Sequence, residues 1–238
     1  MVLVTVIAVL ATAVVIAVNL KPKPGPTGGG LLVPPMSYAT DLVSGDALGK
    51  ADAPVRLEIW SDFQCPICAR LAVEQMPTLV TRFVNTGLLR IESRDIAILG
   101  TGTPDESLEL ATGAVCAARQ NRYWPFHDLV FWNQGRENRG DHSNEFIARV
   151  ATAAEVDMTA WNSCTTKTEL AQAVVTRTTD SAAAGIRSTP TLRINGQVAT
   201  GVPDYNQLHA LITQLLASYS PSPSNGPSAS PAASPAAS

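Results

Sequence analysis

Two cysteines separated by two residues, Cys65-Pro66-Ile67-Cys68, lie where a strand pattern gives way to a helical pattern. Residues 55–61 (VRLEIWS) alternate apolar and polar side chains, as a strand with one buried face does. Pro66 suits the first position of a helix, because its missing N–H would have no partner there. The junction therefore predicts an exposed Cys65 at a helix N-terminus, where free backbone N–H groups and the helix dipole stabilise a thiolate.

Such a thiolate favours redox chemistry at this motif. A stabilised thiolate is a good leaving group, so a disulfide between Cys65 and Cys68 is expected to be oxidising. Cys68, one turn into the helix, is placed to close that disulfide or to resolve a mixed disulfide on Cys65. A structural disulfide and half of a metal site are the alternative interpretations. The remaining cysteines and histidines form no second closely spaced pair, which disfavours a metal site.

The order of patterns along the chain predicts an α/β fold interrupted by helices. The helix that starts at Pro66 is expected to kink at Pro77 and to end at Gly87, before a second strand over residues 88–99. Residues 104–184 then show only helical patterns, and a hairpin and a last helix follow them. The candidate helices are residues 105–119, 124–133, 143–155, 158–164, 168–184 and 205–218, and the hairpin strands are residues 191–194 and 197–200 around an Asn-Gly turn.

Both ends of the chain differ in composition from the 41–218 domain between them. The first 20 residues are almost entirely apolar, and their length approaches that of a bilayer core, which predicts a signal anchor or transmembrane helix over residues 1–20. A cleaved signal peptide is the alternative. Pro and Gly predict a flexible linker over residues 21–40, and a Ser/Pro/Ala composition predicts a disordered tail over residues 219–238. A net charge of -3 gives no reason to expect nucleic acid as a partner.

Three motifs resemble the DsbA-like branch of the thioredoxin superfamily. They are GKADAPVRLEIWSDFQCPIC (residues 49–68), CAARQNRYWPFHDLVF (116–131) and GIRSTPTLRINGQ (185–197), in the order and at spacings similar to those of the family. The resemblance implies a thioredoxin fold with a helical domain inserted at about residues 104–184. It also implies thiol-disulfide exchange at Cys65 and Cys68, with no cofactor and no metal.

The resemblance further assigns Thr189-Pro190 as the cis-proline pair beside the active-site cysteines. In that conformation Thr189 would present its carbonyl and amide groups to a substrate strand near Cys65. An ordinary trans proline that opens the strand over residues 191–194 is the alternative, since cis X–Pro bonds are a small minority.

One position departs from the pattern of thioredoxin-like proteins. The buried acid that helps proton transfer from the second cysteine stands six residues before the first, and here that position is Ile59. Glu58 is one residue away and is expected on the opposite face of the strand. Asp62 is the other nearby carboxylate, and capping is the commoner role of an Asp there. The proton acceptor for Cys68 is therefore in doubt.

Cys116 and Cys164 form a second cysteine pair, 48 residues apart in the helical region. In an exported protein such a pair is expected to form a structural disulfide worth about 3 to 4 kcal/mol, and related actinobacterial-type proteins have a similar pair. Two free buried thiols and a second redox relay are the alternatives.

The aromatic residues and the histidine of these motifs are interpreted mainly as core. Adjacent helical residues do not face each other, so His127-Asp128 is expected to pack or cap rather than to act as a catalytic dyad. Phe63 is expected in the core, with a place in a peptide groove as the alternative.

These patterns predict a protein thiol-disulfide oxidoreductase on the extracytoplasmic side of the cell membrane, held by one N-terminal anchor. We expect it to donate the Cys65-Cys68 disulfide to unfolded exported proteins that contain cysteines. By resemblance, a quinone-coupled membrane protein of the DsbB or vitamin K epoxide reductase type would reoxidise it. A reductase or isomerase is the first alternative, because Thr189 occurs at this position in isomerase-like relatives. A non-catalytic binding module is the second, because Ile59 replaces the acid.

Overall fold

A computed structural model of the 238-residue chain describes residues 30–219. The anchor predicted over residues 1–20 lies outside this range, and so does the predicted tail apart from Tyr219. Within residues 30–219, none of the helices has both the length and the apolar composition needed to span a bilayer.

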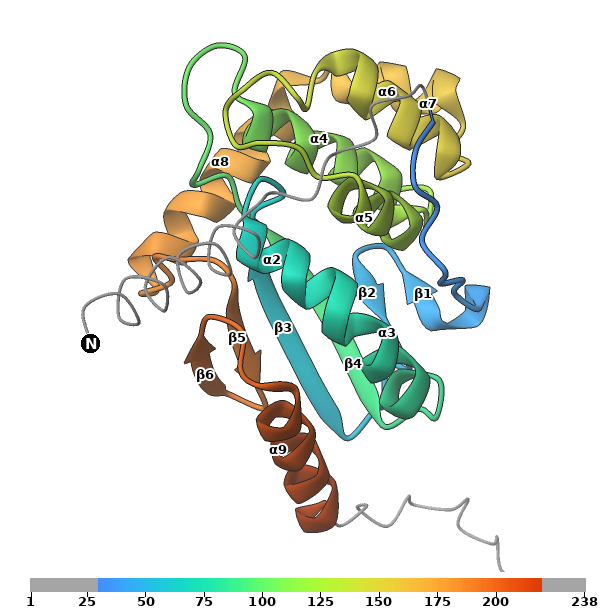
Figure 1. Ribbon diagram of the computed structural model, residues 1–238, viewed down its shortest axis with the longest axis vertical. Coiled ribbons are helices and arrows are strands. Elements are labelled where there is room, and N and C mark those ends of the chain that lie inside the picture. Colours follow the sequence, from blue (N-terminus) through green and yellow to red (C-terminus); the bar gives the residue numbers. More distant parts are fainter. Residues whose placement is uncertain (1–29, 220–238) are drawn as a thin grey trace, which may run out of the picture.

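The described residues contain a six-stranded sheet in the order β1-β2-β4-β3-β5-β6 (Figure 1). The central strands β3 (Val55–Ser61) and β4 (Leu89–Asp95) are parallel, and β5 (Thr191–Ile194) runs antiparallel to β3. The strand β6 (Gln197–Thr200) completes one edge of the sheet. Strands β3, β5 and β6 have the bounds predicted from the sequence, because alternation and the Asn-Gly turn mark them clearly.

The other edge of the sheet carries two short strands that the sequence did not predict. They are β1 (Val43–Ser44) and β2 (Ala47–Leu48), after the short 3-10 turn η1 (Thr40–Leu42), and β2 pairs with β4. Two-residue strands are too short to show an alternating pattern, and they join the sheet only through the pairing of β2 with β4.

The helix after the cysteine motif lies on one face of the sheet, together with the last helix α9 (Tyr205–Ser218) (Figure 1). It contains α2 (Pro66–Arg70) and α3 (Met76–Leu79), and a π-helical segment follows each of them. These segments are η2 (Leu71–Gln75) and η3 (Val80–Val84). Pro77, inside α3, has no N–H to donate, and the backbone therefore changes its hydrogen-bond pattern around it.

The inserted helices pack together at one end of the sheet (Figure 1). Each lies within two residues of its predicted bounds, and Asp105, Ser143 and Asp157 cap three of them through their side-chain oxygens. The helices are α4 (Glu106–Ala118), α5 (Tyr123–Trp132), α6 (Asn144–Ala153), α7 (Met158–Thr165) and α8 (Thr168–Ala183). Their apolar faces join those of the sheet in one continuous core.

The folded part begins earlier in the chain than the sequence predicts. The backbone of Leu32 forms two hydrogen bonds with the side chain of Asn133, of 2.7 and 2.9 Å. Tyr38 packs against the core and donates its hydroxyl proton to Asp128. The flexible linker predicted over residues 21–40 is therefore wrong for this segment, because its ordering comes from contacts with α5 about 100 residues away.

The predicted strand over residues 88–99 is also too long. The strand β4 ends at Asp95, and the backbone N–H groups of Ile98 and Leu99 donate to the Asp62 carboxylate at 2.9 Å each. These two N–H groups thus bond to the side chain of Asp62 and not to a neighbouring strand. The apolar pattern of residues 96–99 does not reveal this difference.

Candidate active site

Cys65 is the N-cap residue of α2 and lies beside the Thr189-Pro190 loop. Its Sγ accepts a hydrogen bond from the backbone N–H of Cys68 at 3.4 Å. The same sulfur is 3.4 Å from the carbonyl oxygen of Thr189, to which the thiol form donates. The Thr189-Pro190 peptide bond is cis. The structure thus brings the cysteine motif together with the loop that the sequence analysis assigned to it.

The two motif cysteines are free thiols, and Cys65 is more enclosed than expected. Cys65 is 5% exposed and Cys68 is 2% exposed, whereas Ile67 between them is 40% exposed. The prediction of an exposed Cys65 is therefore wrong. Its sulfur lies against the Thr189 carbonyl group instead of projecting into solvent.

The surroundings separate the pKa values of the two thiols. A hydrogen bond from the Cys68 side chain lowers the pKa of Cys65 to about 6, with help from Thr189 and from backbone N–H groups. Burial raises the pKa of Cys68 far above its usual range, and the neighbouring Cys65 adds to this effect. At neutral pH Cys65 is therefore the thiolate and Cys68 the thiol, which suits a nucleophile paired with a resolving cysteine.

Glu58 and Ile59 do not supply a proton acceptor for Cys68. Ile59 is 6% exposed and belongs to the core. Glu58 accepts hydrogen bonds from Arg193 and Arg94, and those from Arg193 lower its pKa. The Ser61 hydroxyl, at the end of β3, and the Asp62 backbone act against burial by lowering the pKa of Cys68.

Asp62 has a structural role next to the motif. It is fully buried, and one carboxylate oxygen accepts hydrogen bonds from the Gln64 N–H at 2.9 Å and the Ser107 hydroxyl at 2.7 Å. The other oxygen accepts from the backbone N–H groups of Ile98 and Leu99. This arrangement agrees with the capping role expected for Asp62, and it ties the cysteine loop to the segment after β4.

Two glutamines that the sequence analysis missed hold the backbone around Cys65. The side-chain nitrogen of Gln134 donates to the carbonyl oxygens of Phe63 and Cys65 at 2.7 and 3.1 Å. The Gln64 side chain exchanges hydrogen bonds with Asn138, donating to its side chain at 3.2 Å and accepting from its backbone at 2.7 Å. These pairs are 69 to 74 residues apart, and no local pattern marks them.

His127 and Phe63 lie in an aromatic cluster below the motif. His127 is 6% exposed and packs against Phe63, Phe131 and its neighbours in α5, as expected of a core histidine. Its Nδ1 nevertheless lies 2.9 Å from Asp128 Oδ1, so the expectation that these adjacent side chains do not meet is wrong. Phe63 is 1% exposed, which leaves almost no surface of it for a peptide.

Cys116 of α4 and Cys164 of α7 are joined by a disulfide, with a Cα–Cα distance of 5.8 Å. This pair is thus neither two free thiols nor a reduced relay in the structure. In residues 30–219 no three His, Cys, Asp or Glu side chains gather in a way that would hold a metal ion.

Comparisons with known proteins identify the family. The model of a family described as Thioredoxin matches residues 42–214, which is most of the chain. The probable disulfide bond formation protein D of Bacillus anthracis is 23% identical over 173 residues, covering 71% of this chain and 77% of that protein. Disulfide bond formation protein D of Bacillus subtilis is 24% identical over 191 residues, covering 74% and 82%.

Solved structures share the fold. Oxidised BdbD from Bacillus subtilis superimposes with a TM-score of 0.65 at 21% identity, covering 74% of this chain and 99% of that one. The structure of alpha-DsbA1 from Wolbachia pipientis gives 0.64 at 18% identity, covering 72% and 90%. The α/β thioredoxin fold with an inserted helical domain, expected from the sequence, is confirmed. The chain therefore belongs to the thioredoxin superfamily, as a DsbA-like thiol-disulfide oxidoreductase.

Proposed function

We propose that this protein is an extracytoplasmic thiol oxidase that donates the Cys65-Cys68 disulfide to exported proteins as they fold. The observation that carries the proposal is the lowered pKa of Cys65, about 6, beside a Cys68 whose pKa is raised. Stabilising the thiolate stabilises the reduced form of the protein. A disulfide whose reduced form is stabilised tends to oxidise other thiols.

The exchange proceeds in two displacement steps. A substrate thiolate attacks the Cys65 sulfur, the Cys65–Cys68 bond breaks, and Cys68 leaves as a thiolate that takes up a proton because its pKa is high. A second substrate thiolate then attacks the substrate sulfur of the mixed disulfide. The substrate disulfide forms and Cys65 leaves as the stable thiolate, so that two electrons have passed from the substrate to the protein.

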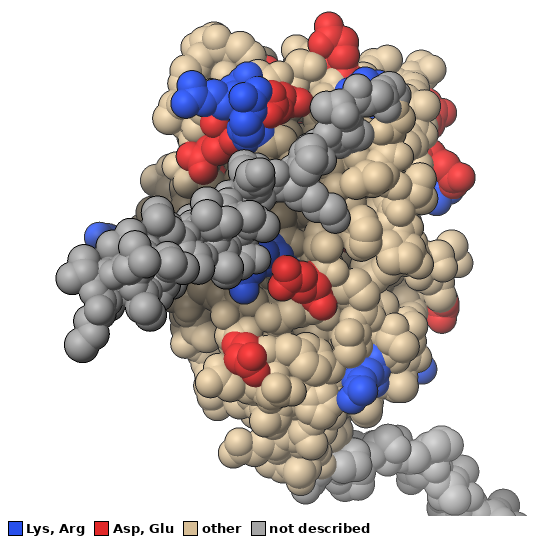
Figure 2. All heavy atoms as spheres, viewed as in Figure 1, with Lys and Arg blue, Asp and Glu red and all other residues tan. Residues whose placement is uncertain are grey.

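The surroundings of Cys65 support this sequence of steps. The cis Thr189-Pro190 loop holds a carbonyl oxygen 3.4 Å from Cys65 Sγ, so a substrate strand paired with that loop would lie next to the reacting sulfur. Charged side chains of both signs are scattered over the visible part of the face that carries α2 and α9, with uncharged surface between them (Figure 2). Such a face does not select substrates of one charge, which suits an enzyme that acts on many unfolded chains.

Other features support the location and the reoxidising partner. The apolar N-terminal segment favours a single membrane anchor. The Cys116–Cys164 disulfide is typical of proteins from oxidising compartments. A membrane protein of the DsbB or vitamin K epoxide reductase type would then accept the two electrons and restore the Cys65–Cys68 disulfide.

A disulfide reductase or isomerase is the second candidate. Thr189 before the cis-proline favours it, since this residue occurs in isomerase-like relatives. The same cysteines would act, but the reduced protein would be the active form. The direction of electron flow therefore distinguishes the two candidates.

The test measures oxidation of a reduced, unfolded protein with paired cysteines by the oxidised full chain. We expect the wild type to form substrate disulfides and the Cys65→Ser variant to form none, because the attacked sulfur is missing. A Cys116→Ala/Cys164→Ala double variant, assayed below its melting temperature, is the matched control and should retain the activity. An unchanged rate in Cys65→Ser would refute the proposal.

A further inference from the structure

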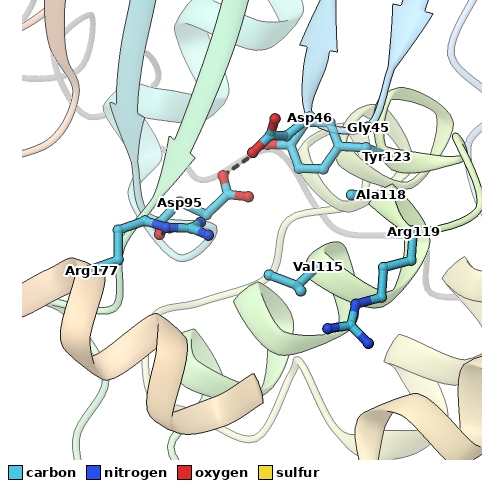
Figure 3. A pocket seen from close by; sticks show the side chains of 8 residues that line it. All are labelled: Gly45, Asp46, Asp95, Val115, Ala118, Arg119, Tyr123 and Arg177. Carbon is cyan, nitrogen blue, oxygen red and sulfur yellow. Dashed lines mark hydrogen bonds between the residues drawn. The ribbon is translucent and has the colours of Figure 1, made fainter. Parts of the chain in front are cut away.

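A cavity of about 250 Å³ lies between the β1–β2 turn, the end of β4 and the helices α4 and α8 (Figure 3). It includes neither cysteine of the active site. Because Asp95 pairs with Ser61 across β3 and β4, the cavity opens near the same end of the sheet, one strand from Ser61. It is lined by Gly45, Asp46, Asp95, Val115, Ala118, Arg119, Tyr123 and Arg177.

Asp95 has one free oxygen in this cavity. The residue is 2% exposed, and its Oδ1 accepts hydrogen bonds from the Ser93 hydroxyl at 3.0 Å and the Tyr123 hydroxyl at 2.8 Å. Within the described part of the chain no donor reaches Oδ2, which is turned toward the open centre in Figure 3. Burial accordingly raises the pKa of Asp95. This oxygen is reached from the cavity and is not sealed off in the core, so a ligand in the cavity that carries a donor group would have an acceptor there.

The other charged side chains of the cavity are also without ion-pair partners among residues 30–219. Asp46 lines the same cavity and its carboxylate accepts no side-chain hydrogen bond, and Arg119 lies on the other side of the cavity (Figure 3). Arg177 donates only to the backbone oxygen of Asp95, at 3.3 Å.

The arrangement of charge limits which ligands fit. Two carboxylates disfavour a simple anion, and two guanidinium groups disfavour a metal ion or a simple cation. The positive charge of Arg177 offsets part of the negative charge of Asp95. It lowers the pKa of Asp95, whereas burial raises it. Asp46 and Arg119 then remain as opposite charges on opposite sides of the cavity, with the apolar surfaces of Val115 and Ala118 between them.

We propose that this cavity binds a small zwitterion, an α-amino acid with a short apolar side chain. Its ammonium group would donate to Asp95 Oδ2 and to Asp46, its carboxylate would pair with Arg119, and its side chain would cover Val115 and Ala118. The site is independent of the cysteine chemistry, since none of its residues belongs to the active site.

Calorimetric titration of the full chain with L-alanine tests the proposal. We expect saturable binding of one molecule per chain. Ethylammonium and acetate, which carry only one of the two charges, should bind at least tenfold more weakly. No saturable binding of L-alanine, or equal binding of all three compounds, would overturn the proposal. L-Alanine has no thiol, so either result leaves the oxidase proposal untouched.

Variants locate the binding. Asp95→Asn keeps an acceptor for Ser93 and Tyr123 but removes the charge, and we expect its Kd for L-alanine to rise at least tenfold. Arg119→Gln should have a similar effect. The matched controls Asp52→Asn and Arg82→Gln change exposed residues outside the cavity and should stay within twofold of the wild type.

A second variant tests the site if the buried Asp95→Asn substitution prevents folding. If Asp95→Asn does not fold, Asp46→Asn replaces it, because Asp46 is only half-buried and its side chain supports no neighbour. L-Alanine affinity unchanged in both Asp46→Asn and Arg119→Gln would place any binding elsewhere and overturn the proposal.

Discussion

Cys65 owes its reactivity to hydrogen bonds that converge on one sulfur. The Cys68 side chain, Thr189 and backbone N–H groups of α2 together lower its pKa to about 6. As the pH of the reduced protein is lowered, we expect its thiolate absorbance at 240 nm to fall, with a midpoint near pH 6. Alkylation of Cys65 should become slower below that pH. The Cys65→Ser variant should lack this transition. A midpoint near 9.0, the ordinary value for a cysteine thiol, would contradict the assignment.

The same shift makes the stability of the reduced protein depend on pH. The pKa of Cys65 is lower in the folded state than its ordinary value of 9.0, so its contribution is complete above pH 9 and is lost as the pH falls through about 6. We expect the difference in unfolding free energy between reduced wild type and reduced Cys65→Ser to grow from pH 6 to pH 9. Urea denaturation across that range measures it, and a difference independent of pH would contradict the shift.

Asp62 stabilises the motif through its four hydrogen bonds. In Asp62→Asn, the amide nitrogen replaces one acceptor oxygen and faces two donors. Either the N–H groups of Ile98 and Leu99, or the N–H of Gln64 and the hydroxyl of Ser107, then lose their acceptor. We expect a loss of about 3 kcal/mol in unfolding free energy. The exposed Asp52→Asn variant is the control and should change stability by less than about 0.5 kcal/mol. Equal stability of the two variants in urea would show that Asp62 is not structural.

At the scale of single residues, the sequence predicts the reacting cysteines better than it predicts the residues that hold the backbone around them. Cys65 and Cys68 are recognisable because their spacing and their place at a strand-to-helix junction have a chemical meaning of their own. Gln134 and Asn138 act only through partners about 70 residues away. No spacing along the chain encodes such a contact, so only the folded structure assigns these residues a role.

The helices and strands differ in how well local sequence determines them. The inserted helices α4 to α8 have capping residues and apolar stripes of their own, and their bounds are predicted within two residues. The strands β1 and β2 and the segment with Leu32 and Tyr38 were missed or misinterpreted. Each is ordered by a distant element, β4 or α5, and not by a pattern within itself.

The disulfide between Cys116 and Cys164 covalently links helices α4 and α7 of the insertion. It closes a loop of 48 residues, and the loss of chain entropy in the unfolded state then corresponds to about 4 kcal/mol. We expect the Cys116→Ala/Cys164→Ala variant to lose about that much unfolding free energy in urea. Because this pair is separate from Cys65 and Cys68, exchange activity below the melting temperature should persist. A loss under about 1 kcal/mol would mean that the disulfide does not stabilise the insertion.

For the whole molecule, the arrangement of the sheet explains why the insertion leaves the active site intact. β3 ends at the cysteine loop, and β5 begins directly after the cis Thr189-Pro190 bond. These strands are neighbours in the sheet although about 130 residues separate them in the chain. The helical insertion connects β4 to β5 beyond the sheet, so the cysteine loop and the proline loop still meet.

The equilibrium reduction potential of the full chain determines the direction of electron flow. Thioredoxin, with a cysteine pKa near 7, has a potential of about -270 mV, and DsbA, with a pKa near 3.5, has about -120 mV. A pKa of about 6 places Cys65 between them, nearer to thioredoxin. We therefore expect a potential above about -270 mV but below that of the strongest oxidants.

Equilibration with glutathione buffers, followed by thiol counting, measures this potential. The Cys116→Ala/Cys164→Ala variant should give the same value, since the second disulfide takes no part in the exchange. A potential at or below that of thioredoxin would mean that the reduced protein is the active form. The protein would then be a reductase that receives electrons through the membrane, with the same Cys65 thiolate attacking substrate disulfides instead of leaving from its own.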